Sequence, residues 1–464
     1  MTNPHVVTPT EIDIRQSADR VIAHFRRGDA DEGFTLLQRL RETEREVVQE
    51  GLDRYVAAAV LRDGGPLSAE VRGRNADSAA RLDRALGPPR IPDFSHAPTE
   101  PNEFVGLTET QKFHVYASMV DVRGNEAARV DLQRNNHTVL LGLRRETSTL
   151  ASHGGGRNGT GVYDDQIVVL GRTEGGSEHV YVAGRASTEP TAQYSHHAGS
   201  DGNRPFSGSE QRERRVIDAA GGYEGVQWRK IEGEDVNADT MWDLGRLAEG
   251  TIEMFRAEHP NPRIAGGRDA FRPSPEQMLR PAGMVERDTN ADGYFTAADP
   301  LGVQPLNGSF KIHSGSRYNT DSAGCQTIHP ADYRAFIDAA QSNPRQTRWQ
   351  YVLTSTQGGL FHNVEVGGDR AQPAAPPEAP PVERPADRQG SATQPSGPFE
   401  NPDLNRYYEA VIAGDKAMAN RIALGFAFRA PEPAMQSAND HTRLAPSNEG
   451  QMASLQREAP GLHI

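Results

Sequence analysis

Hydrophobic positions near the start of the chain recur at the spacing of a helix. Between Ile14 and Phe25 they fall three or four residues apart, which places their side chains on one face of a helix. The same period returns over residues 34–60. No grouping of candidate catalytic side chains accompanies these runs, so residues 1–86 are predicted to form a helical accessory domain.

The pattern changes after a proline-rich stretch, residues 87–103, which is predicted to be an extended linker. From residue 104 onward, short apolar runs broken by Gly, Asn and Asp are typical of strands. The clearest of these runs cover residues 136–144, 163–170, 179–188 and 349–354. Residues 104–366 are therefore predicted to form one central, β-rich domain, with residues 259–280 irregular.

The last hundred residues divide again by composition. Residues 367–398 are a mixture of Pro, Ala, Glu and Arg with almost no large apolar side chains, which predicts a disordered linker. Helical periodicity returns in residues 399–464, which are predicted to form a small helical module with a disordered tail. The predicted fold class is α+β and multidomain, with helical pieces on both sides of the β-rich domain.

Charge and hydropathy restrict the partners. The formal net charge of −13 argues against nucleic acid as the main partner. No run is long and apolar enough to span a bilayer. The first twenty residues lack the basic end and apolar core of a Sec signal. We therefore expect a chain that is made in the cytoplasm and needs another route to act beyond it.

The single cysteine, Cys325, is the strongest candidate for chemistry. It ends the turn Ser322-Ala323-Gly324-Cys325, after an apolar run that ends in His313 and before a predicted helix at 331–340. A thiol becomes a nucleophile when a base or a positive field favours the thiolate, and both a histidine and a helix N-terminus can do so. The alternative is an inert cysteine buried as a small hydrophobic residue.

This arrangement resembles the active-site signature of the L,D-transpeptidase (YkuD-type) catalytic domain family, in a divergent branch with a Ser-x-Gly-Cys-Gln motif. The resemblance implies that Cys325 is the nucleophile and His313 the base. It also implies that Ser322 and Gly324 shape the turn, with main-chain N–H groups of Gly324 and Cys325 as oxyanion donors.

Two positions depart from the family pattern. Ala323 stands where the family has histidine, and Thr327 stands where it has arginine. The resemblance therefore supports a prediction of the fold better than a prediction of the reaction. Two later histidines, His329 and His362, keep open a Cys-His amidase or endopeptidase that uses one of them as base.

The activity that the resemblance implies is acyl transfer on stem peptides of peptidoglycan, as transpeptidase or carboxypeptidase, with no cofactor required. A wall substrate and the missing Sec signal together suggest a bacterial antibacterial effector, exported by a specialised secretion system to act in a periplasm. Its further partners would be a secretion-machine adaptor or an immunity protein. The alternative of another class is a non-enzymatic, calcium-stabilised binding module.

Three further residues are predicted to bind substrate. Arg144 and Asp165 stand at ends of the first two predicted strands, and Gln326 follows the cysteine. By the resemblance, Arg144 and Asp165 would line the groove. Charges at strand ends are also common as caps or salt bridges without a role in binding, and that alternative stays open for both.

Residues 288–299 have the spacing of a calcium loop. Oxygen-bearing side chains at alternate positions, a glycine at the sixth position and a closing acid at the twelfth are what such a loop needs. The predicted ligands of a structural calcium are Asp288, Asn290, Asp292, Tyr294 through its carbonyl, and Asp299. A turn ordered by Asx side chains is the alternative.

Two other polar stretches are not expected to form a site. Residues 235–239 repeat the alternating acids but lack the glycine and the twelfth acid, so no metal is expected there. The pair His196-His197 is expected to lie in a solvated loop, because adjacent residues of an extended chain point to opposite sides.

Overall fold

The computed structural model describes residues 14–62, 67–89, 102–154, 158–199, 222–226, 228–259, 268–278, 283–299 and 303–356. All of the described residues belong to one unit, Met1–Gly368. The predicted linker at 367–398, the C-terminal module at 399–464 and His362 lie outside the described residues. Those that are described combine helices with a mixed β-sheet, so the fold is α+β.

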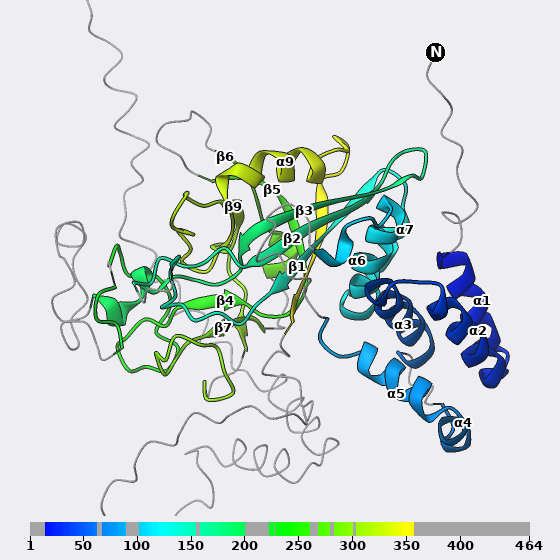
Figure 1. Ribbon diagram of the computed structural model, residues 1–464. Coiled ribbons are helices and arrows are strands. Elements are labelled where there is room, and N and C mark those ends of the chain that lie inside the picture. The colour runs from blue at the N-terminus through cyan, green and yellow to red at the C-terminus, as the bar shows by residue number, and fades with distance from the viewer. Residues whose placement is uncertain are drawn as a thin grey trace, which may run out of the picture. The chain divides into compact units, whose positions relative to one another are not determined.

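The helical period near the start of the chain corresponds to a small bundle (Figure 1). Its apolar positions, among them Val21, Leu37 and Val56, pack into a core of their own. A buried ion pair between Arg41 and Asp53, 2.6 Å long, ties two of the helices together. The helices are α1 (Ile14–Arg26), α2 (Ala30–Glu42), α3 (Glu46–Leu61), α4 (Ala69–Arg74) and α5 (Ala76–Ala85).

The segment after the predicted linker is helical, so the prediction of strands from residue 104 onward is wrong there. A short 3-10 turn, η1 (Asn102–Phe104), leads to α6 (Glu109–Arg123) and α7 (Glu126–Gln133). α6 lies between α3 and the sheet, so apolar residues cover more than one of its faces and the usual one-sided period is lost. The signal that was available is the capping box of Thr108 and Gln111.

Eight strands of the described chain close into a barrel (Figure 1). Their order is β1-β11-β5-β6-β9-β10-β3-β2, with β1/β11 and β9/β10 parallel and the other pairs antiparallel. The strands are β1 (His137–Arg144), β2 (Asp165–Arg172), β3 (Glu178–Ser187), β5 (Gly250–His259), β6 (Arg268–Pro273), β9 (Ile312–Ser314), β10 (Gln326–Ile328) and β11 (Arg348–Ser355).

The apolar runs of the central domain are strands that are buried on both faces. In β1, Leu140 packs inside the barrel, whereas Val139 and Leu141 pack outward against the α6–α7 layer. Helix α9 (Pro330–Ala340) adds Phe336 to the core inside the barrel. Its start matches the prediction closely, because the His329 side chain caps it by accepting the Ala331 N–H at 3.2 Å.

A second, three-stranded sheet has the order β4-β7-β8. It consists of β4 (Gly245–Leu247), β7 (Gly283–Arg287) and β8 (Val303–Pro305). Leu247 and Val285 join the barrel core, which fastens this sheet to the barrel. The prediction that residues 259–280 are irregular is wrong, because this stretch includes β6 and the short helix α8 (Pro275–Met278). Few apolar residues mark either element in the sequence.

The histidine pair does not lie in a solvated loop. It starts the 3-10 turn η3 (His196–Ala198), directly after η2 (Ala192–Tyr194). His196 is fully buried, and its Nδ1 accepts the Trp242 N–H at 2.9 Å. The prediction failed because the partner is 46 residues away in sequence.

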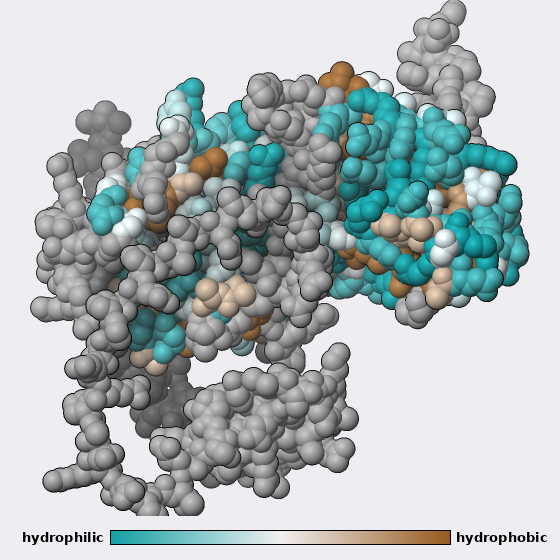
Figure 2. Space-filling model, turned by 60° about the horizontal axis from the view of Figure 1, so that its bottom comes forward, coloured by the Kyte–Doolittle hydropathy of each residue, from teal (hydrophilic) through white to brown (hydrophobic). Residues whose placement is uncertain are grey.

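The described surface is mostly hydrophilic on the face that Figure 2 shows, with hydrophobic residues in small separate patches. Large hydrophobic side chains that are exposed lie far apart in the sequence, for example Val105, Val130 and Trp242. Among the helices that are described, none is long and apolar enough to cross a membrane.

Candidate active site

Cys325 lies directly before β10, at the end of a turn that Ser322 closes. The Ser322 hydroxyl donates to the Cys325 carbonyl at 2.7 Å and accepts the Gly324 N–H at 3.2 Å. Its own carbonyl accepts the Thr191 N–H at 2.8 Å. The turn is therefore fixed both internally and to the segment that follows β3. Because Ser322 uses the Gly324 N–H, that group is not available as the predicted oxyanion donor.

Gly324 is required by both the conformation and the packing of this turn. Its φ is 125°, a value that residues with a Cβ rarely adopt. A Cβ placed there would lie 2.6 Å from the carbonyl oxygen of Gly245 in β4. The turn thus rests directly on the main chain of the three-stranded sheet.

The surroundings of Cys325 favour the neutral thiol over a preformed thiolate. Burial raises the pKa of Cys325 to about 11; the Lys311 N–H and charge act to lower this pKa, and Glu232 raises it. The residue as a whole is partly exposed, but protein surrounds the sulfur enough for desolvation to dominate. The predicted helix does not help, since β10 separates Cys325 from the start of α9.

His313 lies on β9, the strand next to β10, and is 4% exposed. Its Nδ1 lies 3.0 Å from the carbonyl oxygen of Ser314. Since a carbonyl can only accept, Nδ1 carries the proton and Nε2 is the basic nitrogen of the neutral ring. The imidazole also stacks on His259 of β5, with ring centroids 4.0 Å apart. His259 was not predicted, because the stacking depends on β5 and β9 both bordering β6.

The register of β9 and β10 brings the base candidate close to the nucleophile candidate. Thr327 pairs with His313, and the Gln326 N–H donates to the Lys311 carbonyl at 2.7 Å. Cys325 lies two residues before Thr327, the β10 partner of His313, so the Cα atoms of Cys325 and His313 are roughly 8 Å apart by standard strand spacings. The thiol points to the Ser309 carbonyl, at 3.5 Å. Proton transfer to His313 therefore requires rotation about the cysteine Cα–Cβ bond.

The three residues predicted to bind substrate are buried, and the structure corrects that prediction. Gln326 is fully buried, donates to the Gly324 carbonyl at 3.5 Å and accepts the Tyr351 hydroxyl at 3.0 Å inside the barrel. Asp165 is fully buried and caps main-chain N–H groups of Arg145 and Thr188, each at 2.6 Å.

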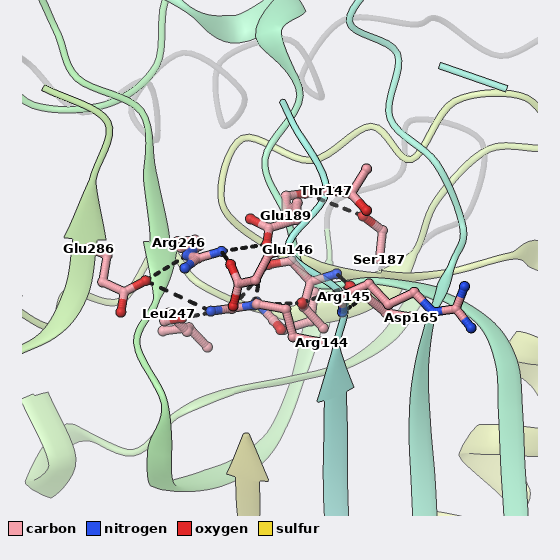
Figure 3. A network of polar contacts seen from close by, with 12 residues as sticks. Arg144, Arg145, Glu146, Thr147, Asp165, Ser187, Glu189, Arg246, Leu247 and Glu286 are labelled. Carbon is pink, nitrogen blue, oxygen red and sulfur yellow. Dashed lines mark hydrogen bonds and ion pairs between the residues drawn. The ribbon is translucent and has the colours of Figure 1, made fainter. Parts of the chain in front are cut away.

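Arg144 is fully buried as well, in the polar network of Figure 3. It donates to the Leu247 carbonyl at 2.7 Å and to the Thr188 hydroxyl at 2.9 Å. Arg144 and Asp165 were predicted either to line a groove or to cap and salt-bridge strand ends. The structure shows the second arrangement. Arg144 connects β1 to β4 instead of facing a groove.

A second arginine, Arg246 of β4, is the centre of the same network (Figure 3). It is 2% exposed and bonds three carboxylates, Glu146 and Glu286 at 2.6 Å and Glu189 at 2.5 Å. Burial by itself would lower the pKa of Arg246, but the surrounding carboxylates raise it above its ordinary value. Residues from four separate segments meet here. Gly245, which supports the cysteine turn, directly precedes Arg246 in β4.

Glu189 gives this network a measurable pH dependence. Burial raises its pKa to about 7, against the opposing effect of Arg246 and Arg144. The unfolded carboxyl titrates at about pH 4.3, so the folded state holds a proton that the unfolded state releases between those values. The stability contributed by the protonated Glu189 is therefore complete below pH 4.3 and is lost as the pH rises to about 7, by about 4 kcal/mol.

Glu189→Gln should remove this fall, because an amide does not titrate in that range. The measurement is the difference in unfolding free energy between pH 5 and pH 8, by urea titration, for both proteins. Glu174→Gln, at an exposed position, is the matched control and should keep the wild-type difference. An unchanged difference in Glu189→Gln would contradict the assignment.

The predicted calcium loop is ordered by its own side chains. Asp288 accepts the Gly293 N–H at 3.1 Å, and Asp292 accepts the Tyr294 N–H at 2.8 Å. Asp299 accepts the N–H groups of Thr289 and Thr296. These are the bonds of the Asx-turn alternative, and in a calcium loop they coexist with the ion because each carboxylate has a second oxygen.

The described surface has hollows away from Cys325, between α3 and α6. One is lined by residues that include Glu50, Arg54 and Val115. It brings no nucleophile next to a base, so it offers no competing catalytic arrangement.

The base candidate lies on β9, and the nucleophile candidate lies directly before the neighbouring parallel strand β10, in a turn that the three-stranded sheet supports. Membership of the L,D-transpeptidase family stays a prediction from the residues around Cys325. Comparison of the chain with models of known families, with curated proteins and with solved structures finds no match.

Proposed function

We propose that the chain is a cysteine acyltransferase or peptidase of the L,D-transpeptidase type, acting on peptide amides of peptidoglycan stems. Cys325 is the nucleophile and His313 the general base. The observation that supports this proposal most is the Ser314 carbonyl at the Nδ1 of His313. It orients the ring as a third group orients the base in a nucleophile–base pair, and it assigns the basic lone pair to Nε2.

The chemistry starts from a neutral thiol. As Sγ attacks the amide carbonyl carbon, the thiol proton passes to Nε2 of His313, giving a tetrahedral intermediate and an imidazolium. The C–N bond breaks, His313 returns the proton to the leaving amine, and a thioester with Cys325 remains. An acceptor amine then gives a transpeptidation product, and water gives a free carboxylate. Transfer of the proton during attack means that no resting thiolate is needed.

The test is mass analysis of muropeptides incubated with the purified full chain. We expect cross-linked or shortened stem peptides, and Cys325→Ser should reduce their rate of formation by at least 100-fold, since a positioned nucleophile contributes at least that much. Products from wild type and variant at equal rates would exclude Cys325 as nucleophile. No product with either protein would favour the binding-module alternative.

The wall-directed role has a separate test in cells. Fused to a Sec leader and sent to the periplasm of a bacterium, the wild-type chain should be toxic and Cys325→Ala should not. Equal toxicity of the two forms would exclude the catalytic version of an exported effector. Pull-down with the toxic form would then identify an adaptor or immunity partner, which stays a prediction.

A further inference from the structure

Two loops of the chain have the same sequence pattern and the same main-chain conformation. Residues 235–239 and 288–292 both read Asp-x-Asn-Ala-Asp. The fourth residues, Ala238 and Ala291, have φ values of 60° and 55°. The sixth residues, Thr240 and Gly293, have φ values of 74° and 84°. Thr240 thus adopts the conformation for which glycine is the ordinary choice, and the missing glycine does not change the loop.

The internal hydrogen bonds of the two loops also correspond. The sixth N–H donates to the first aspartate at 3.1 Å in both loops. The fifth N–H donates to the asparagine at 3.1 Å in one loop and 2.9 Å in the other. The seventh N–H donates to the fifth residue's carboxylate at 2.7 Å and 2.8 Å.

Each loop is closed by a buried acid, although the spacing differs. Asp299, the twelfth residue of its loop, accepts the N–H of the second residue, Thr289, at 2.8 Å. Asp243, only the ninth residue of the other loop, accepts the N–H of the second residue, Val236, at 3.3 Å. A count along the sequence could not identify Asp243 as the equivalent group.

The observation that points to a ligand is an unpartnered oxygen in each loop. Asp243 is 1% exposed and Asp288 is 4% exposed, and the Oδ1 atom of each is buried without a hydrogen-bond partner. Such an atom costs free energy unless something satisfies it.

We propose that residues 235–243 form a calcium-binding loop that is the partner of the loop at 288–299. Asp235, Asn237, Asp239 and Asp243 supply oxygens, and main-chain carbonyls and water complete the shell. Calcium is the fitting ion because it takes several hard oxygen ligands in a flexible geometry. In the described part of the chain no three acidic, histidine or cysteine side chains already converge as a metal site. Binding would draw the carboxylates together around the ion.

The two loops belong to one unit, because they meet at the same end of the β4–β7 ladder. Gly245, just after the first loop, pairs with Arg287, just before the second. The Asp288 N–H donates to the Leu244 carbonyl at 3.1 Å, and the Arg287 guanidinium donates to the Asp243 carbonyl at 3.1 Å. An ion in one loop therefore orders the main chain of the other.

Hydrogen bonds connect the paired loops to the segments that contact the cysteine turn. Glu234, at the base of the first loop, bonds Arg287 at 2.8 Å and accepts from Asn307 at 2.8 Å. Asn307 is two residues before Ser309, whose carbonyl accepts the Cys325 thiol. The carbonyl of Gly245 also lies against Gly324. The ions would thus hold the support on which the turn rests.

The test is terbium luminescence and calcium calorimetry on the full chain, with the metal ions alone. Trp242 is the eighth residue of the first loop and is 44% exposed, whereas Trp228 and Trp349 are buried. We expect two calcium ions per chain and tryptophan-sensitised terbium emission that calcium displaces. Trp242→Phe should reduce that emission at least tenfold. Asp239→Asn should remove one calcium, and Asp292→Asn should remove the other while keeping the tryptophan-sensitised signal.

The control is Asp338→Asn, an exposed acid on α9, which should still bind two ions. Circular dichroism of each variant shows whether it is folded, and Asp239 is itself exposed. One calcium per chain that Asp239→Asn leaves in place would overturn the loop at 235–243. Emission that survives Trp242→Phe would do the same. No calcium at all would overturn both loops, while the proposed catalytic function would still be open to its own test.

Discussion

Replacing Arg246 by leucine should lower the free energy of unfolding by about 3–5 kcal/mol, the cost of removing one partner from a buried ion network. The guanidinium is the shared cation of Glu146, Glu189 and Glu286. Leucine would leave three buried carboxylates with only Arg144 nearby, so they would have to take up protons or draw in water. The loss should therefore be larger at pH 8 than at pH 5.

Urea titration of the full chain measures this effect, with Arg256→Leu as the matched control. Arg256 also pairs with an aspartate, Asp269, at 2.7 Å, but its side chain is 62% exposed. Exposed pairs contribute at most about 1 kcal/mol. Arg246→Lys should give an intermediate loss, because one ammonium cannot match the planar fork that reaches all three carboxylates. Equal losses for Arg246→Leu and Arg256→Leu would show that the network carries no special weight.

Strands with a long apolar run could be predicted from the sequence, whereas several elements without a long apolar run were missed. β1, β2 and β11 are each eight residues long and bury both faces, so a mostly apolar run marks each of them. β10 has three residues, too few for any periodicity to identify, whereas the strand expected to carry His313 is present as β9 but begins only at Ile312. α6 was missed because its apolar residues face both α3 and the barrel.

The candidate site shows the same division between local and long-range information. The turn around Gly324 and the cap of α9 at His329 depend on neighbouring residues, and their types are readable in the sequence. Arg144 was misjudged because its partners, Thr188 and Leu247, are 44 and 103 residues away. No local pattern states whether a strand-end charge meets solvent or a buried partner.

The state of the thiol could not be predicted for a related reason. A cysteine beside a histidine in sequence suggests a thiolate, but the pKa depends on how completely the folded chain desolvates the sulfur. Burial raises the pKa of Cys325 to about 11, and the charge of Glu232, which is distant in sequence, acts in the same direction. In the proposed mechanism His313 would therefore act during attack on the substrate, and it would not maintain an ion pair at rest.

His313→Ala should therefore affect two rates differently, the turnover of stem peptides and the alkylation of the thiol. If Cys325 and His313 formed an ion pair at rest, the substitution would lower both rates together. The turnover of stem peptides, as kcat/KM, should fall by about 10²–10⁴-fold, the usual contribution of a general base. Alkylation of the resting thiol by iodoacetamide at pH 7 should change less than threefold, because burial sets its pKa. In wild type that alkylation should be roughly 100-fold slower than for a free thiol of pKa 8.5, and it should rise with pH up to about pH 11.

Two controls make this result decisive. Lys311→Met should slow alkylation further, since the Lys311 charge opposes the effect of burial on the thiol pKa. His329→Ala, which removes a helix cap and not the base, should lower helix stability by about 1 kcal/mol and leave kcat/KM within a few-fold of wild type. Alkylation that is already fast at pH 7 and falls 100-fold in His313→Ala would instead establish a resting thiolate–imidazolium pair. The basic nitrogen would then serve Cys325 before substrate arrives, and the neutral-thiol mechanism would be wrong.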